Sequence, residues 1–190
     1  MKNLIQIIYI SRSTFAATDS AGTIEPNVAR ILAKSRSNNR IKGLVGVLYF
    51  GDGCFFQCLE GEESTVDTLY KTLLEDSRHK DLKLLSRKMI SELSFPDWSM
   101  KYVGVDNQMK HLLSSNGYKK FDPYAFDGDM VHKVMGLLHL ATDPSRSEEQ
   151  TASTLGQQPI QDRKLAKWAI FLSSLALAIS LGSFLVVISK

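Results

Sequence analysis

The first 140 residues alternate between apolar runs typical of strands and apolar stripes typical of helices. A run of β-branched and apolar residues, Leu4 to Ile10, predicts a first strand followed by a polar loop. Pro26 lies where proline often begins a helix, and apolar residues recur at helical spacing after it, which predicts a helix over Pro26 to Ser37. The chain therefore begins with a strand and a helix.

A hairpin and a second helix are predicted next. Gly43 to Phe50 and Cys54 to Leu59 are almost wholly apolar, and the glycine-rich turn between them indicates a hairpin of buried strands. Ser64 and Asp67 have the spacing of a capping box. The apolar stripe that follows predicts a second helix, which reaches Leu74.

Two more strands complete the pattern, over Leu82 to Ile90 and over Ser99 to Val105. The order of elements is that of a ferredoxin-like α+β sandwich, with two helices on one face of a mixed five-stranded sheet. Apolar stripes in Met109 to Leu113 and Val131 to Leu138 predict C-terminal helices that cover the other face. We therefore expect a core over residues 1–105 and a helical cap over 106–141.

The composition changes after this cap. Residues 142–162 are rich in Ser, Thr, Gln, Glu and Pro, and they predict a disordered linker because they bury too little apolar surface to offset the entropy of ordering. Within residues 163–190, the 22 residues from Trp168 to Ser189 carry no charge, which is long enough to cross a bilayer. We expect a C-terminal transmembrane helix that anchors the protein, and the alternative is a hydrophobic helix in a dimer interface.

Basic residues flank this stretch on its N-terminal side. Arg163, Lys164 and Lys167 precede it and only Lys190 follows, so the positive-inside rule places the preceding domain in the cytoplasm, at the cytoplasmic membrane. These four residues hold the basic excess, since 19 basic and 20 acidic residues remain in 1–162. A nucleic-acid-binding face is not indicated, because such faces need clustered cations. The two cysteines have the spacing of neither a zinc site nor a redox pair, and no metal is expected.

Several polar side chains occur where a plain core would not hold them. Tyr9 and Ser11 follow apolar residues on one face of the first strand, and Gln57 interrupts the apolar run of the third. Asn38-Asn39 ends the first predicted helix, and Trp98-Ser99-Met100 precedes the last strand. A buried hydroxyl or amide costs about 1–3 kcal/mol unless it is hydrogen-bonded, so their convergence would indicate a polar ligand. Taken singly, each has an ordinary explanation, such as a strand-edge tyrosine, a helix cap or a solvent-facing glutamine.

Five stretches together resemble the successive signatures of the BLUF family of blue-light photoreceptors. They are Ile8-Tyr9-Ile10-Ser11; Asn38-Asn39 with Gly43-Leu44-Val45-Gly46; Phe55-Phe56-Gln57-Cys58-Leu59-Glu60-Gly61; Asp76-Ser77-Arg78-His79; and Phe95-Pro96-Asp97-Trp98-Ser99-Met100. They occur in the family's order and with its spacing, over roughly 100 residues.

The resemblance implies a non-covalent FAD whose isoalloxazine ring lies between the two predicted helices, edge-on to the central strands. In this arrangement Ile31 and Leu73 would flank the ring, and Asn39 and Gln57, assisted by Asn38, would bond its polar edge. A flat apolar ring needs aliphatic walls, and its carbonyl and nitrogen atoms need amides that both donate and accept. The rest of the implied cofactor-binding set is Tyr9, Asp76, Arg78 and His79, of which the last three are also expected as a helix-end ion pair or cap.

The resemblance also implies a light-driven switch. In the family, the excited flavin takes an electron and a proton from the tyrosine at Tyr9 through the glutamine at Gln57, and recombination leaves the flavin's hydrogen bonds rearranged. Ser11 belongs to the same unit, and Trp98 and Met100 match a pair that exchanges places near the glutamine. Two positions depart from the family: Thr72 replaces an arginine of some relatives, and Leu93 replaces a basic residue. These departures leave the choice between FAD and FMN open.

We therefore expect a sensor without a catalytic module, which signals to a separate downstream protein or to another copy of itself as a homo-oligomer. Two other functions are open on the same fold: a small flavin-dependent oxidoreductase or acylphosphatase-like hydrolase, and a membrane-anchored interaction module without flavin. The sequence shows no glycine-rich phosphate loop, no paired carboxylates and no nucleophile–base pair. His111, His132 and His139 are interpreted as surface or helix-face residues.

Overall fold

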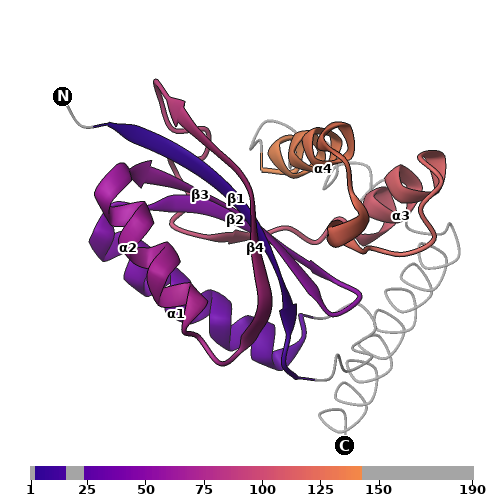
Figure 1. Cartoon of the computed structure of the whole chain (residues 1–190), viewed down its shortest axis with the longest axis horizontal. Coiled ribbons are helices and arrows are strands. Elements are labelled where there is room, and N and C mark those ends of the chain that lie inside the picture. The colour runs from indigo at the N-terminus through magenta and orange to yellow at the C-terminus, as the bar shows by residue number, and fades with distance from the viewer. Residues whose placement is uncertain (1–2, 16–23, 143–190) are drawn as a thin grey trace, which may run out of the picture. The chain divides into compact units, whose positions relative to one another are not determined.

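The fold is a mixed sheet between two layers of helices (Figure 1). The computed structural model describes residues 3–15 and 24–142 of the chain. In chain order the elements are β1 (Leu4–Ser13), α1 (Pro26–Lys42), β2 (Val45–Gly51), β3 (Cys54–Glu62), α2 (Glu63–Leu74), β4 (His79–Ile90), β5 (Lys101–Tyr102), α3 (Asp106–Ser115), a short 3-10 helix (Pro123–Ala125) and α4 (Gly128–Leu140).

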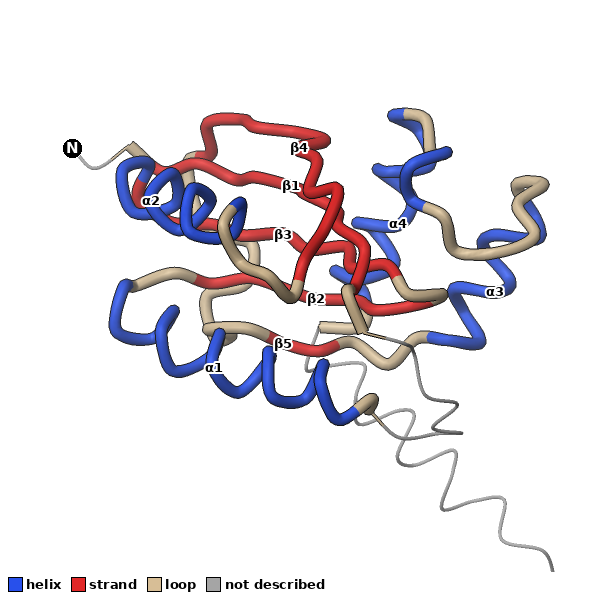
Figure 2. The backbone as a smooth tube through the Cα atoms, turned by 60° about the horizontal axis from the view of Figure 1, so that its bottom comes forward, coloured by secondary structure: helices blue, strands red, loops and turns tan. Residues whose placement is uncertain are grey.

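The sheet has five strands in the order β4-β1-β3-β2-β5 (Figure 2). β1 pairs with β3 and β4, and β2 pairs with β3, all antiparallel, whereas β5 lies parallel to β2. β1 and β3 are therefore the central strands, flanked on both sides. Their side chains alternate between the two faces of the sheet, so each face has its own core.

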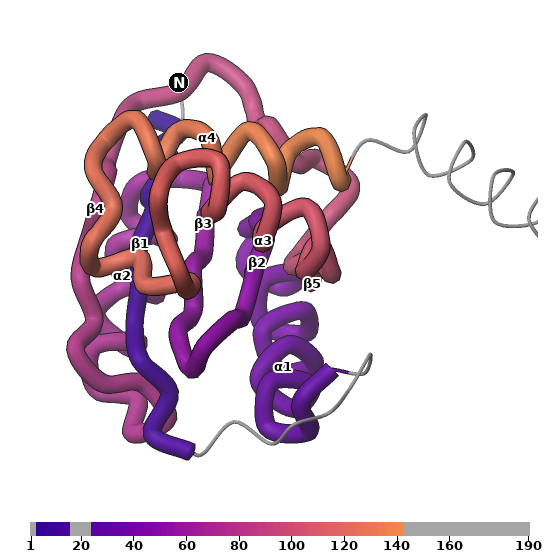
Figure 3. The backbone as a smooth tube through the Cα atoms, turned by 90° about the vertical axis from the view of Figure 1, so that its right-hand side faces the viewer, coloured from indigo at the N-terminus to yellow at the C-terminus, as the bar shows by residue number. Residues whose placement is uncertain are grey.

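The helices form two layers, with α1 and α2 on one face of the sheet and α3 and α4 on the other (Figures 1 and 3). Met109 and Leu113 of α3, together with Val134 and Leu138 of α4, are buried against the strands. This arrangement confirms the predicted mixed five-stranded α+β sandwich with C-terminal helices on its second face. The two cysteines, Cys54 and Cys58, are buried in the same core, as two small apolar side chains on one face of β3.

Helix α1 is longer than the sequence predicts. It begins at Pro26, where the side chain of Glu25 accepts a hydrogen bond from the amide of Val28 at 2.8 Å. The prediction that it ends at Asn38-Asn39 is wrong, because the helix continues to Lys42 and ends on Gly43, which has a left-handed φ of 65°. Asn39 thus lies inside the helix and points toward the sheet rather than capping the end.

Two other local predictions also differ. No capping box forms at the start of α2: Glu62 is the N-cap without a side-chain cap bond, and the Ser64 hydroxyl donates to the Glu62 carboxylate at 3.1 Å instead. The fifth strand is limited to Lys101–Tyr102, which pair with Val47 and Leu48 of β2. β5 is therefore a short edge strand rather than a full-length strand.

The predicted transmembrane anchor does not fall in the part of the chain that the structure describes. None of the helices in residues 3–15 and 24–142 is both long enough and apolar enough to span a bilayer. The predicted anchor, residues 163–190, and the predicted linker from residue 143 onward lie outside the described residues.

Candidate functional site

A tyrosine and a glutamine lie side by side at the centre of the sheet. Tyr9 of β1 is the direct cross-strand neighbour of Gln57 of β3, and both side chains face α1 and α2. They are 1% and 2% exposed. The Tyr9 ring meets Tyr70 of α2 edge to face, with ring centroids 6.0 Å apart. Because both strands are flanked by others, the position of this pair is fixed by the backbone pairing.

Tyr9 and Gln57 line a pocket between α1 and α2. Its lining residues come from β1, β3, both helices, the turn after α2 and the segment before β5: Tyr9, Lys34, Ser35, Asn38, Asn39, Gln57, Leu59, Leu69, Thr72, Leu73, Asp76, Arg78 and Met100. The structure therefore brings together eight of the residues singled out from the sequence: Tyr9, Asn38, Asn39, Gln57, Leu73, Asp76, Arg78 and Met100.

The remaining four predicted site residues do not line this pocket. Ile31 is buried in the core beneath α1. Ser11 and His79 are bonded to each other, with Oγ 2.8 Å from Nδ1, and the imidazole packs against the Phe55 ring at 4.7 Å between centroids. Trp98 packs against the core on the opposite face of the sheet. Ser11 and His79 are neighbours of the site rather than parts of its wall.

Five lining residues were missed by the sequence reasoning: Lys34, Ser35, Leu59, Leu69 and Thr72. Lys34 and Ser35 precede Asn38 and Asn39 by one helical turn, so the i, i+4 spacing on α1 was the available signal. Thr72 was noted only as a departure from the family. Leu59 follows Gln57 by two residues on β3 and therefore shares its face.

The backbone before β5 is held by side chains and an amide of neighbouring elements. The carbonyl of Trp98 accepts from the amide of Gly46 at 3.0 Å, and that of Ser99 accepts from Asn39 Nδ2 at 2.7 Å. The carbonyl of Met100 accepts from Arg36 Nε at 2.8 Å. Three successive carbonyl groups are thus bonded to α1 and β2, and this network holds the Met100 side chain in the pocket, where it is 2% exposed.

The electrostatics of the site favour a protonated tyrosine beside a fixed ion pair. Burial raises the pKa of Tyr9 well above its ordinary value, and the nearby Cys58, Tyr70 and Asp76 raise it further. Asp76 accepts from Arg78 Nε at 2.9 Å, and this hydrogen bonding is the main reason that its pKa falls to about 2. Tyr9 therefore keeps its proton at neutral pH, and Asp76 keeps its charge.

The side chains present fit a flavin. Leu69, Leu73 and Met100 provide aliphatic walls, and the amides of Asn38, Asn39 and Gln57 provide donors and acceptors. In the described part of the chain, Gln57 Nε2 is buried without a hydrogen-bond partner, as expected for a donor that awaits a ligand acceptor. The pocket volume is about 90 Å³, below the roughly 300 Å³ of typical ligand pockets, so exposed side chains at its mouth must turn outward when the ring binds.

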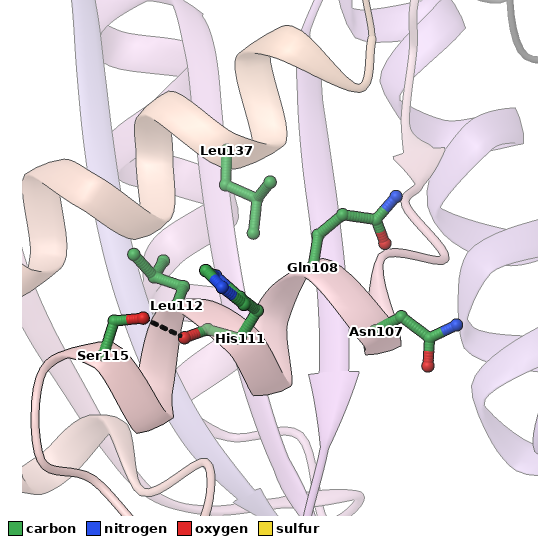
Figure 4. A pocket seen from close by; sticks show the side chains of 6 residues that line it. All are labelled: Asn107, Gln108, His111, Leu112, Ser115 and Leu137. Carbon is green, nitrogen blue, oxygen red and sulfur yellow. Dashed lines mark hydrogen bonds between the residues drawn. The ribbon is translucent and has the colours of Figure 1, made fainter.

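A second pocket lies between α3 and α4, on the other face of the sheet (Figure 4). It is lined by Asn107, Gln108, His111, Leu112, Ser115 and Leu137. The Ser115 hydroxyl donates to the backbone carbonyl of His111 at 2.8 Å and not to the imidazole, so the two do not form a nucleophile–base pair. In residues 3–15 and 24–142, no group of three or more His, Cys, Asp or Glu side chains is arranged to hold a metal ion.

A buried Tyr–Gln pair beneath a pocket with aliphatic walls and side-chain amides is the arrangement expected of a flavin-binding sensory domain. Residues 4–101 match the family described as BLUF, sensors of blue-light using FAD. This match covers about half of the chain, and the chain belongs to this family. The domain is therefore a blue-light sensor that uses FAD, and it is a sensory rather than a catalytic domain.

Solved structures and curated proteins agree with this assignment. The photo-activated state of BlsA superposes with a TM-score of 0.62 at 30% identity, covering 72% of this chain and 94% of BlsA. The dark state of the BLUF protein BlrB superposes with a TM-score of 0.57 at 26% identity, covering 74% of this chain and 96% of BlrB. Photoactivated adenylate cyclase subunit beta of Euglena longa is 27% identical over 110 residues, which are 57% of this chain and 12% of that protein. The chain thus spans a small part of the cyclase.

Proposed function

We propose that Tyr9, Gln57 and Met100 form the light-responsive unit of this sensor. The observation that carries the proposal is the Gln57 amide, which lies directly beside Tyr9 and is buried with its Nε2 unpaired within the described residues. A side-chain amide can rotate and exchange its donor and acceptor. Gln57 is therefore suited to present a different hydrogen bond to the flavin after illumination, which an aliphatic side chain in its place would not do.

The chemistry of Tyr9 explains why electron and proton leave together. Bound FAD supplies blue-light absorption and an excited state that accepts an electron. Burial opposes a tyrosinate, as the raised pKa of Tyr9 shows, and a charged radical cation would be equally costly in the same surroundings. A phenol that loses an electron and a proton together becomes a neutral radical, so no charge is left in the buried site. The Gln57 amide, adjacent on β3, is the group that relays this proton toward the cofactor and back.

The segment that contains Met100 contacts the end of the C-terminal helix α4. Met100 is followed by Lys101 of β5, whose Nζ lies 3.4 Å from the carbonyl of Ala141 at the end of α4. Phe95 contacts His139 of α4 with ring centroids 5.5 Å apart. A movement of the segment before β5 would therefore alter contacts at the end of α4. We propose that the output is a changed surface there, recognised by a separate protein or a second copy of the chain.

The first test is the visible absorption spectrum of the full chain before and after blue light. The wild type is expected to show oxidised flavin with a small red shift that reverses in the dark. Gln57→Leu should bind flavin without this shift, and Gln108→Leu, the same change on the surface of α3, should keep it. An unchanged shift in Gln57→Leu would overturn the proposed switch. Bleaching of the wild-type flavin on illumination would favour a flavin oxidoreductase instead.

We further propose that residues 168–189 anchor the sensor in the cytoplasmic membrane. The support is the uncharged stretch with basic residues on its N-terminal side. The test compares the full chain with a chain that ends at residue 162, after cells are broken and membranes are washed with alkaline carbonate. The full chain should stay in the membrane fraction and the shorter chain in the supernatant. Release of the full chain by the wash would refute the anchor.

A further inference from the structure

Two cationic side chains line the flavin pocket, and they differ in what they contact. Arg78 lies in the turn after α2 and is hydrogen-bonded to Asp76 through Nε and Nη2. Its charge is therefore offset by an adjacent carboxylate. Lys34 lies on α1, is exposed, and has no ion-pair partner among residues 3–15 and 24–142. Lys34 is thus the uncompensated positive charge of the pocket wall.

The position of Lys34 corresponds to the outer end of the pocket. Lys34 and Asn38 are one turn apart on α1 and share a face, and both are exposed, whereas Asn39, Gln57 and Tyr9 at the inner end are buried. The pocket therefore has a polar, uncharged floor on the sheet and a positive mouth. A ligand that satisfies both ends must carry hydrogen-bonding groups on one edge and negative charge at the other.

A flavin nucleotide has this polarity. On the isoalloxazine ring, N5 and N10 lie on opposite edges, and the ribityl chain with its phosphate is attached at N10. When the N5 edge meets the Gln57 amide at the pocket floor, the ribityl chain must leave through the open side. The phosphate then comes out on the side where Lys34 is exposed, and the ammonium group pairs with phosphate as a point charge on a flexible stem.

We propose that Lys34 binds the phosphate of the flavin nucleotide and thereby selects phosphorylated flavins over riboflavin. This inference rests on the proposed function, in which the Gln57 amide forms a hydrogen bond with the flavin. Thr72 on α2 lines the pocket without a charge, and Lys34 on α1 supplies the positive charge from the other wall. Since the ion pair between Lys34 and the phosphate is exposed to solvent, its contribution to the binding free energy is modest and sensitive to salt.

The test uses the full chain in detergent, freed of flavin and titrated with riboflavin, FMN and FAD while flavin fluorescence is followed. Wild type should bind FMN up to about fivefold more tightly than riboflavin at low salt, as expected for one exposed charge pair. In Lys34→Met the FMN and FAD affinities should fall to that of riboflavin, whose own affinity stays unchanged. Added salt should remove the wild-type preference and leave the variant unaffected.

The matched control is Lys110→Met on α3, which removes the same charge on the other face of the sheet and should keep the preference for FMN. Three results would overturn the inference: a wild type without preference, a preference that survives in Lys34→Met, or an equal loss of riboflavin binding in that variant, which would show that Lys34 packs against the ring. Failure of riboflavin, FMN and FAD alike to bind the wild type would refute the flavin site as a whole, so the two failures are distinguishable.

Discussion

Replacing Gln57 with leucine should stabilise the flavin-free protein while weakening its hold on the cofactor. Gln57 is 2% exposed, and its Nε2 has no hydrogen-bond partner within the described residues. An unsatisfied buried donor costs about 1–3 kcal/mol, and leucine of similar volume removes that cost. For a domain of this size the melting temperature should rise by roughly 3–10 °C. Loss of one or two amide hydrogen bonds to the flavin should weaken binding about tenfold.

Two measurements check this prediction on the same preparations. Thermal unfolding of the flavin-free chain, followed by circular dichroism, compares wild type with Gln57→Leu, and flavin titration of the folded proteins gives the affinities. Gln108→Leu is the control, because an exposed position should change stability by less than about 0.5 kcal/mol. If flavin-free Gln57→Leu melts below wild type, the Gln57 amide is already satisfied in the folded chain, and the reasoning fails.

Three further predictions concern the surroundings of the pair. Burial lowers the pKa of His79 below its ordinary value, so the folded chain favours the neutral ring. The chain therefore has its full stability above pH about 6.5, where the unfolded chain also carries neutral histidine. Stability is lost as pH falls from there toward the folded-state pKa, because the unfolded chain takes up the proton first. The melting temperature of wild type should therefore fall more between pH 7 and pH 5 than that of His79→Asn. Arg36→Leu removes the bond to the Met100 carbonyl. If the proposed switch moves this segment, return to the dark spectrum after blue light should slow about threefold or more. Gly46→Ala should destabilise the domain by about 1–3 kcal/mol in urea unfolding, because the added Cβ would lie 2.1 Å from a carbonyl oxygen of β3.

Each of these has a result that contradicts it. Equal pH dependence in wild type and His79→Asn would show that His79 does not titrate differently in the folded chain. Arg30→Leu is the control for the Arg36 variant, since Arg30 is exposed on α1 and bonds only to Asn27 in the described contacts; matching recovery rates in the two variants would remove any role for the Arg36 bond. A Gly46→Ala protein as stable as wild type would mean that β2 and β3 can separate at no cost.

The layers of the fold and the centre of the site follow from local sequence patterns. Period-two and helical spacing predict the strands and the four main helices, because burial on one face fixes that spacing. Tyr9 and Gln57 are recognisable because each is a polar residue in an apolar strand. The pairing of β1 with β3 that makes them neighbours is a long-range contact, which the spacing of residues along the chain does not specify.

The features that the sequence does not predict are the length of α1 and which of its residues line the pocket rather than the core. Asn38-Asn39 resembles a helix end, but Gly43 is the residue that adopts the left-handed conformation. Between them, Arg40 and Lys42 are polar and Ile41 is exposed, so no apolar stripe signals a continuing helix. Ile31 and Lys34 lie less than one turn apart on α1, yet the first packs into the core and the second lines the pocket. Local periodicity identifies the inward face of a helix, whereas the place where that face opens into a pocket depends on tertiary packing.

The length of β5 gives the sensor a mechanical asymmetry. Tyr9 and Gln57 are on strands held on both sides along most of their length, whereas the wall formed by Met100 leads into a strand that pairs over only two residues at the sheet edge. Displacing that edge breaks few backbone hydrogen bonds, while shifting β1 or β3 would break many. The Tyr9–Gln57 pair is therefore held rigidly, whereas the segment before β5 is easier to displace. In the proposed switch, an energy change of a few hydrogen bonds at the cofactor would be enough to move the segment before β5 while β1 and β3 stay in place.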